Sequence, residues 1–179
     1  MAKAEKFSVV GKRVQRFEGF DKVTGTSQFV ADIQLPGELI GKVYFADSDK
    51  GLVIKPRLKG LSAGDHGFHV HANRSCKPAK SPEGKMVPGL GAGGHYDPDK
   101  SGKHEGPTGK GHLGDLPALK VGADGTVKGT LMAPRLKVAD LKKHSLMIHA
   151  GGDNYSDQPA ALGGGGARFA CGVIGKGKN

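Results

Sequence analysis

Short apolar runs separated by turn residues dominate the chain. The stretch GKVYFADSDKGLVIKPRL (41–58) predicts two strands joined by a turn at SDKG, and HGFHVHA (66–72) predicts a third strand. The stretch ALKVGADGTVKGTLM (118–132) predicts a hairpin with its turn at ADG. HSLMIHA and RFACGVIG, near the C-terminus, are each short enough for one strand, and VADLKKH (138–144) fits one helical turn. This pattern is typical of an all-β sandwich or barrel.

Two long segments between these runs have no periodicity. Residues 77–114 and 150–167 are rich in glycine and polar residues, and structureless loops of this length in a compact domain are usually functional. The GGGG run at 163–166 is costly in entropy to order. We therefore expect its backbone to pass close to another group, or the loop to be held by a disulfide or a metal.

Composition and charge narrow the function only slightly. The 179 residues, of which 36% are hydrophobic and 25% charged, suit one folded domain. No apolar run approaches the roughly 20 residues that span a bilayer, and the N-terminal MAKAEKFSVVGKR does not fit a secretory signal. The net charge of +10 fits a solvated basic surface, attraction of a small anion, or nucleic-acid binding. The aromatic–basic interleaving of nucleic-acid binders is missing.

Histidine spacing is the clearest chemical signal in the chain. His69 and His71 are two residues apart in a predicted strand, so both side chains leave the same face. That spacing suits two ligands of one metal ion, and a surface-facing pair is the alternative.

A second group of metal-ligand residues lies in the first long loop and directly after it, in GHYDPDKSGKHEGPTGKGHLGD (94–115). His95, His104, His112 and Asp115 provide three imidazoles and a carboxylate, a set that suits structural zinc. The alternative is a solvated basic loop. Because four imidazoles suit Cu(II), the histidines also allow a copper set made of the strand pair, His149 and one ligand shared with the zinc set.

Two cysteines, Cys76 and Cys171, lie far apart in the sequence. They are either buried free thiols or one disulfide, and a disulfide would indicate an oxidising compartment.

Five motifs carry a family resemblance, and they occur in the order HGFHVHANRSC, GLGAGGHYDP, GKHEGPTGKGHLGDLPAL, HSLMIHAGGDNYSDQP and GGGGARFACGVIG. Over about residues 41–175 the chain resembles the bacterial form of copper/zinc superoxide dismutase. The resemblance implies an all-β fold, an eight-stranded Greek-key flattened barrel related to the immunoglobulin-like sandwich, an architecture for which this family is a known example. It implies disproportionation of superoxide to dioxygen and hydrogen peroxide with copper (Cu) and zinc (Zn) as cofactors. A non-catalytic metal-binding domain of the same fold is the alternative.

The resemblance also implies roles for individual residues. The ligands fall into a copper set of His69, His71, His95 and His149 and a zinc set of His95, His104, His112 and Asp115, with His95 bridging the metals. Asp153 would link a copper ligand to a zinc ligand, and Arg168 would bind the anion beside the copper. Cys76 and Cys171 would form a disulfide. His66 is expected to be a hydrogen-bonded structural residue, and no role is predicted for His144.

The resemblance further implies superoxide as the partner, with no nucleic acid and no membrane, and it is compatible with a homodimer. The implied compartment is periplasmic or extracellular, although no signal peptide is expected in this chain.

Residues 1–40 depart from the family pattern. GKRVQRFEGFDKVTG and ADIQLPG instead resemble the N-terminal segment of the large subunit of the molybdenum hydroxylases, the xanthine and aldehyde oxidase family, and we infer no molybdenum chemistry from this short stretch. The expected division is an atypical segment over 1–40 and a superoxide dismutase domain over 41–179. Residues 26–35 (TSQFVADIQL) alternate and are expected to supply the first strand of the barrel.

Overall fold

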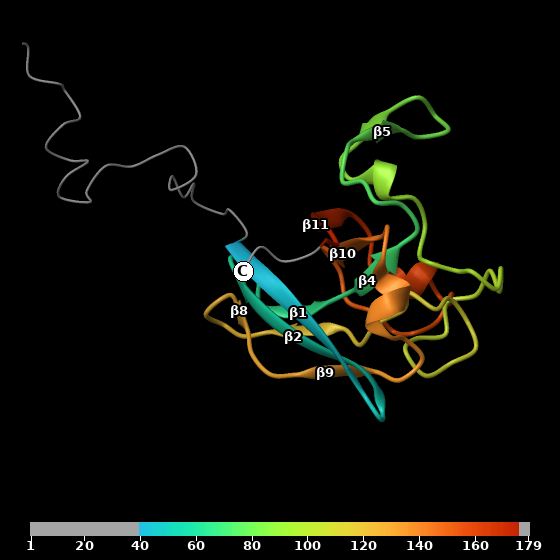
Figure 1. Ribbon diagram of the computed structural model, residues 1–179. Coiled ribbons are helices and arrows are strands. Elements are labelled where there is room, and N and C mark those ends of the chain that lie inside the picture. Colours follow the sequence, from blue (N-terminus) through green and yellow to red (C-terminus); the bar gives the residue numbers. More distant parts are fainter. Residues whose placement is uncertain (1–39, 176–179) are drawn as a thin grey trace, which may run out of the picture. The chain divides into compact units, whose positions relative to one another are not determined.

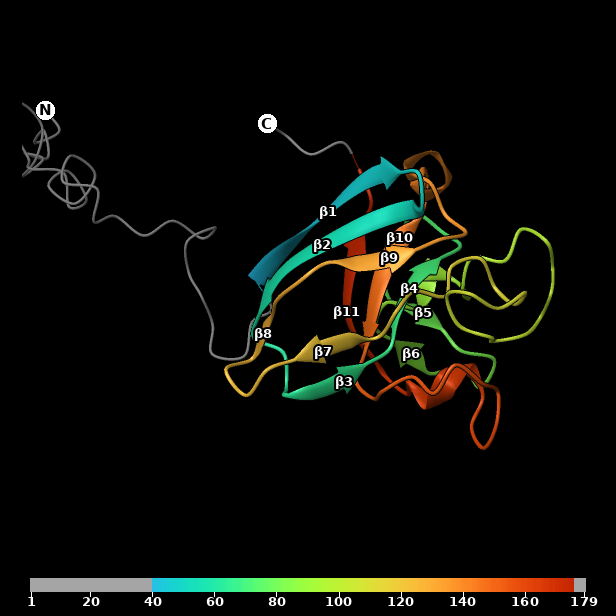
Figure 2. The same ribbon diagram turned by 90° about the horizontal axis from the view of Figure 1, so that it is seen from below.

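Two antiparallel sheets make up the body of the described part of the chain (Figure 1). The computed structural model describes residues 40–175, and Figure 2 shows the larger sheet in front of the smaller one. The larger sheet has six strands, in the order β1 (Ile40–Ser48), β2 (Gly51–Lys59), β8 (Thr126–Val127), β7 (Leu119–Val121) and β3 (Gly64–His66), with β9 (Leu131–Ala133) also pairing with β2. The smaller sheet contains β11 (Arg168–Val173), β10 (Ser145–His149) and β4 (Phe68–His71).

The long segments contain only short regular elements. In the first loop these are a two-stranded ribbon, β5 (Ala79–Lys80) and β6 (Met86–Val87), and a 3-10 turn, η1 (Leu90–Ala92). Two more 3-10 turns, η2 (Val138–Leu141) and η3 (Leu162–Gly164), lie before β10 and before β11. The helical turn predicted in 138–144 is confirmed as η2.

The predicted all-β class is confirmed, and the arrangement is consistent with a Greek-key sandwich. The described sheets do not close into a barrel, and they contain more and shorter strands than the eight expected. The strand predicted for residues 26–35 lies outside the described part of the chain. Among the residues that are described, no helix is long and apolar enough to cross a membrane.

Alternation along β2 shows why this sequence forms a sheet with one buried face. Leu52, Ile54 and Leu58 are buried, whereas Lys55 and Arg57 between them are exposed. Successive side chains of a strand point to opposite faces, so β2 covers the core with one face and meets solvent with the other.

The hydrophobic core lies between the two sheets. It joins the buried side chains of β2 to those of the smaller sheet, which are Phe68 and Val70 of β4 and Leu146 and Ile148 of β10. Because side chains alternate along a strand, the residues between these must lie on the outer face of the smaller sheet.

The predicted strand 66–72 is interrupted at Gly67. His66 ends β3 in the larger sheet, and Phe68 begins β4 in the smaller one. The Gly67 amide donates to the Gly151 carbonyl at 2.8 Å, and the Gly67 carbonyl accepts from the His149 amide at 2.8 Å. The chain therefore passes from one sheet to the other at this glycine, and the hydrogen bonds bring the second long loop beside β4.

Candidate metal centre

Three histidines share the outer face of the smaller sheet. His69 and His71 alternate with the core residues of β4, and His149 ends the neighbouring strand β10. The prediction that the first two point to the same face is confirmed by this alternation.

The first long loop adds four more polar side chains by running along the free edge of β4. Antiparallel bridges join His71 to His95 and His69 to Asp115. The Val70 amide donates to the Gly114 carbonyl at 2.9 Å, which fixes the loop against the strand. His104 and His112 come from the same loop, and the cluster of six histidines and one aspartate is buried throughout, with exposures of 8% or less.

The second long loop fixes the orientation of two of these rings through Asp153. One carboxylate oxygen accepts from His69 Nε2 and the other from His104 Nε2, each at 2.7 Å. Backbone carbonyls orient two further rings, since His71 Nδ1 donates to Gly93 at 2.8 Å and His149 Nδ1 donates to Gly166 at 3.2 Å. Carboxylates and carbonyls only accept hydrogen bonds, so each of these ring nitrogens carries the hydrogen.

The opposite nitrogens of the His69, His71 and His149 rings carry lone pairs and point into the cluster. Among the described residues, five of its buried ring nitrogens lack a hydrogen-bond partner, namely His69 Nδ1, His71 Nε2, His95 Nε2, His112 Nδ1 and His149 Nε2. Two further donor atoms, His104 Nδ1 and Asp115 Oδ2, face each other at 2.9 Å. Each unpaired buried polar atom costs about 1–3 kcal/mol. A bound cation removes that cost, so the chemistry of the donor atoms fits a metal site.

The donor atoms form two overlapping groups. The first donor group is His69, His71, His95 and His149, and the second is His69, His95, His104 and Asp115; within each group the donor atoms lie within 4.8 Å of one another. His112 falls outside the second group, although its Nδ1 is 3.5 Å from Asp115 Oδ1. His69 and His95 belong to both groups. The two nitrogens of His95 differ in their surroundings, because Nδ1 lies 2.9 Å from Asp115 Oδ1 while Nε2 is unpaired.

Burial keeps the first donor group neutral. It lowers the pKa of His69 to about 3 and the pKa of His71 to about 2, and it also lowers the pKa of His95 and of His149. Neutral imidazole is the form that binds a metal, so these rings need not lose a proton at neutral pH.

The aspartates make the other end of the cluster favourable for positive charge. Burial opposes a charge on His104, but contacts with Asp115 and Asp153 outweigh it and raise the pKa of His104 to about 9. Burial likewise disfavours the charged form of Asp115 and of Asp153, but their histidine contacts hold both pKa values well below the usual range. Two carboxylates that stay ionised therefore face this end of the cluster.

Comparison with known proteins identifies the family. The family model for copper/zinc superoxide dismutase (SODC) matches residues 39–174. Cu-Zn superoxide dismutase of Brucella abortus is 52% identical over 159 residues, which are 88% of this chain and 91% of that protein. Cu-Zn superoxide dismutase 1 of Salmonella typhimurium is 63% identical over 142 residues, which are 78% of this chain and 80% of that protein. The chain belongs to the copper/zinc superoxide dismutase family.

The solved structure of the Brucella abortus Cu/Zn superoxide dismutase matches this fold with a TM-score of 0.74 at 55% identity, covering 76% of this chain and 88% of that one. Copper and zinc are the metals of the family, and the donor groups fit both. Four imidazole nitrogens suit Cu(II), and imidazoles with a carboxylate suit zinc.

The dismutase family resemblance also implied a disulfide, and the structure contains it between Cys76 and Cys171. The bond ties the first long loop to β11, close to Arg168. That arginine donates to the Gly89 and Gly93 carbonyls, each at 2.6 Å. Because Gly93 also accepts from His71, a single carbonyl connects the guanidinium to the first donor group.

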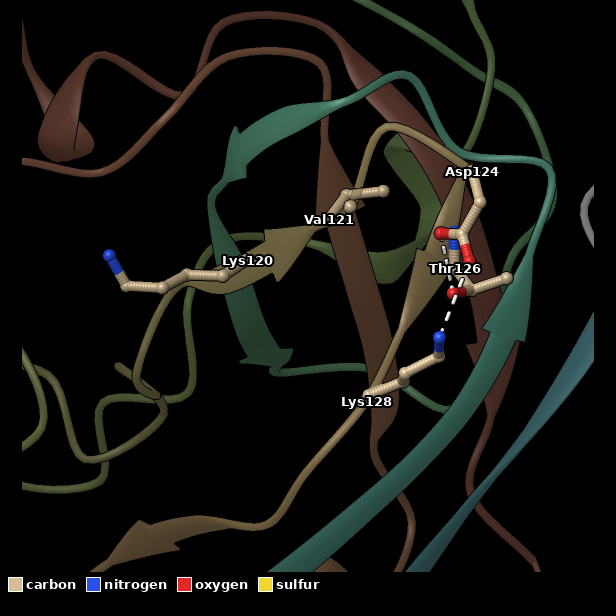
Figure 3. Close-up of a pocket in the computed structure, with 6 residues that line it drawn as sticks. Lys120, Val121, Asp124, Thr126 and Lys128 are labelled. Atoms are coloured by element: carbon tan, nitrogen blue, oxygen red, sulfur yellow. Dashed lines mark hydrogen bonds and ion pairs between the residues drawn. The ribbon is translucent and has the colours of Figure 1, made fainter.

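Two cavities differ in their relation to the dismutase site. One of about 240 Å³ is lined by Arg168, Met147 and the disulfide, and its Arg168 shares the Gly93 carbonyl with His71. The other, of about 300 Å³, lies at the β7–β8 turn, where Asp124 pairs with Lys128 (Figure 3). No residue of either donor group lines either cavity.

The two remaining histidines support the backbone of the dismutase site. His66, as expected, is hydrogen-bonded, with Nδ1 2.7 Å from the His149 carbonyl and Nε2 2.9 Å from the Ser62 carbonyl. His144, which had no predicted role, donates from Nδ1 to the Ala72 carbonyl at 2.8 Å and packs its ring against Tyr96.

Sequence reasoning missed the backbone acceptors Gly93 and Gly166 and the carboxylate of Asp157, which accepts from the His104 amide at 2.9 Å. Carbonyls carry no side-chain signal, and Asp157 lies in a loop without periodicity. The expectation for the GGGG run is confirmed, because added methyl groups at Gly163 and Gly165 would meet Asp153 and His149.

Proposed function

We propose that the buried histidine cluster is the active site of a superoxide dismutase, and that residues 41–179 form the dismutase domain. The enzyme disproportionates superoxide to dioxygen and hydrogen peroxide. The observation that carries the proposal is the convergence of seven buried donor atoms from six histidines and one aspartate, five of which have no hydrogen-bond partner.

The proposed ligands divide between the two metals. Copper is held by His69, His71, His95 and His149, and zinc by His95, His104, His112 and Asp115. The copper set is supported by its match to the first donor group. The zinc set is supported by the second donor group, which contains three of the four proposed zinc ligands. The fourth, His112, directs an unpaired Nδ1 at Asp115. When bound, copper supplies one-electron redox chemistry and zinc supplies a fixed positive charge without redox chemistry.

The protein orients the donors and provides one atom for a proton. Asp153, Gly93 and Gly166 fix the ring orientations, so the inward nitrogens are presented without rearrangement. His95 faces Asp115 through Nδ1, so its unpaired Nε2 would be the nitrogen available to copper or to a proton.

The substrate is an anion, and positive charge favours its approach. We propose that Arg168, which lines a cavity and shares the Gly93 carbonyl with the cluster residue His71, attracts and binds superoxide. The net charge of +10 supports the same role for the whole protein. Electrostatic steering, for which superoxide dismutase is an established example, raises association rates by roughly 10–10³-fold and weakens with salt.

We propose a periplasmic or extracellular location. The Cys76–Cys171 disulfide supports it, because such bonds persist in oxidising compartments.

Single ligand substitutions test the assignment. His149→Ala is expected to lose copper and activity while it keeps zinc, and His112→Ala is expected to weaken zinc while copper still binds. Metal content by mass spectrometry and superoxide-dependent dye reduction, measured on the same reconstituted samples, give the answer. Activity retained in His149→Ala, or both metals bound by the wild type without activity, would contradict the proposed function.

A further inference from the structure

The carboxylate of Asp157 joins two backbone segments that are distant in sequence. Oδ2 accepts from the His104 amide at 2.9 Å, and Oδ1 accepts from the Leu162 amide at 3.0 Å. The first contact reaches a member of the second donor group, and the second reaches the start of η3 in the loop that covers it.

The two contacts bear directly on how His104 is held. Asp153 fixes the His104 ring through Nε2, but the position of the ring also depends on the position of the backbone that carries it. Asp157 supplies a side-chain contact to that backbone. At the other end, Leu162 precedes Gly163, whose backbone passes against both the Asp153 carboxylate and the His104 ring.

We propose that Asp157 is a positioning residue for zinc: by holding the His104 and Leu162 amides together, it fixes the His104 ligand and closes the second long loop over the zinc-side donors. The inference rests on the proposed function, because it takes His104 as a zinc ligand. Asp157 itself touches no metal donor atom.

The Asp157 bridge between the two amides requires two acceptor oxygens, so replacing Asp157 by asparagine tests it. Asparagine keeps one acceptor oxygen and places an NH₂ group where the second acceptor stood, so one backbone amide loses its partner. Outer-shell partners of metal ligands typically contribute 10–100-fold to affinity. We expect Asp157→Asn to weaken zinc binding by roughly that factor.

The copper set provides an internal comparison. His71 and His149 are oriented by the Gly93 and Gly166 carbonyls, and neither contact involves Asp157. Copper affinity should therefore change by less than about threefold in the same variant, against the roughly 10–100-fold loss at zinc.

Asp124→Asn is the matched control, because Asp124 also accepts a backbone amide in a surface turn, that of Thr126 at 3.1 Å, but lies at the β7–β8 turn away from the cluster. The experiment measures zinc affinity of the full chain by competition with a chromophoric chelator, copper affinity in the same way, and thermal unfolding of the metal-free proteins.

The expected result is weakened zinc binding in Asp157→Asn alone, with copper affinity retained and with melting temperatures of the two metal-free variants within a few degrees of each other. Zinc affinity equal to that of the wild type, or an equal loss of both metals together with a lower melting temperature, would overturn the inference. A wild-type chain that binds no zinc would overturn the proposed function as well, so the two failures are distinguishable.

Discussion

Replacing Gly163 by alanine tests whether the second long loop sets the position of Asp153. A methyl group at Gly163 would overlap Asp153 Oδ1 and lie 2.8 Å from His104 Nε2. Gly164 offers a matched control, since its φ of +75° is close to the +72° of Gly163, but the nearest atom to its added methyl is 3.8 Å away. Both variants therefore carry the same left-handed backbone strain of about 1–2 kcal/mol, and only one carries the overlap.

The magnitudes follow from these contacts. Displacing Asp153 from His104 removes a charge-assisted hydrogen bond worth about 1.5–3 kcal/mol, which corresponds to a loss of zinc affinity of roughly 10–100-fold. Backbone strain alone lowers the melting temperature by roughly 2–4 °C per kcal/mol in a chain of this size. Gly164→Ala should accordingly melt a few degrees lower and bind zinc normally, whereas Gly163→Ala should also bind zinc weakly.

The assay measures zinc competition with a chromophoric chelator and thermal unfolding of the metal-free proteins. Equal zinc affinities in the two alanine variants would refute the reasoning, because they would show that Asp153 does not depend on the space that Gly163 leaves free.

Two further predictions concern the arginine and the disulfide. Arg168→Ala should lower kcat/KM for superoxide by roughly tenfold and reduce the salt dependence of kcat/KM without metal loss. Arg168→Lys should keep the charge and most of the rate. An unchanged rate in the alanine variant would exclude a role of Arg168 in anion binding. Replacing Cys76 and Cys171 together by serine opens a link between residues separated by 95 positions and should lower the unfolding free energy by about 4–5 kcal/mol in urea titrations. A loss below about 1 kcal/mol would show that the link does not restrict the unfolded chain.

Local periodicity was enough to predict the strand residues of the site. The spacing of His69 and His71 dictates a shared face for any strand, and the structure places both on β4 opposite the core. The hairpin at β1 and β2 follows from alternation in the same way. The residue types of the loop suggested a zinc set, but its assignment came from the family resemblance, since spacings of nine and eight residues among His95, His104 and His112 specify no local geometry.

Long-range contacts account for what could not be predicted. The break at Gly67 depends on a hydrogen bond to Gly151, and the apolar pattern continues through it without a signal. His104 depends on Asp153 and Asp157, which lie 49 and 53 residues further along in a loop without periodicity. The positions of such residues depend on contacts between two loops, and these contacts form only in the folded chain.

Metal content and dismutation measured on one reconstituted sample test the central claim most directly. We expect one copper and one zinc per chain, in keeping with two donor groups, and fast disappearance of superoxide that slows as salt is added. Zinc without copper, or both metals bound without dismutation, would contradict it.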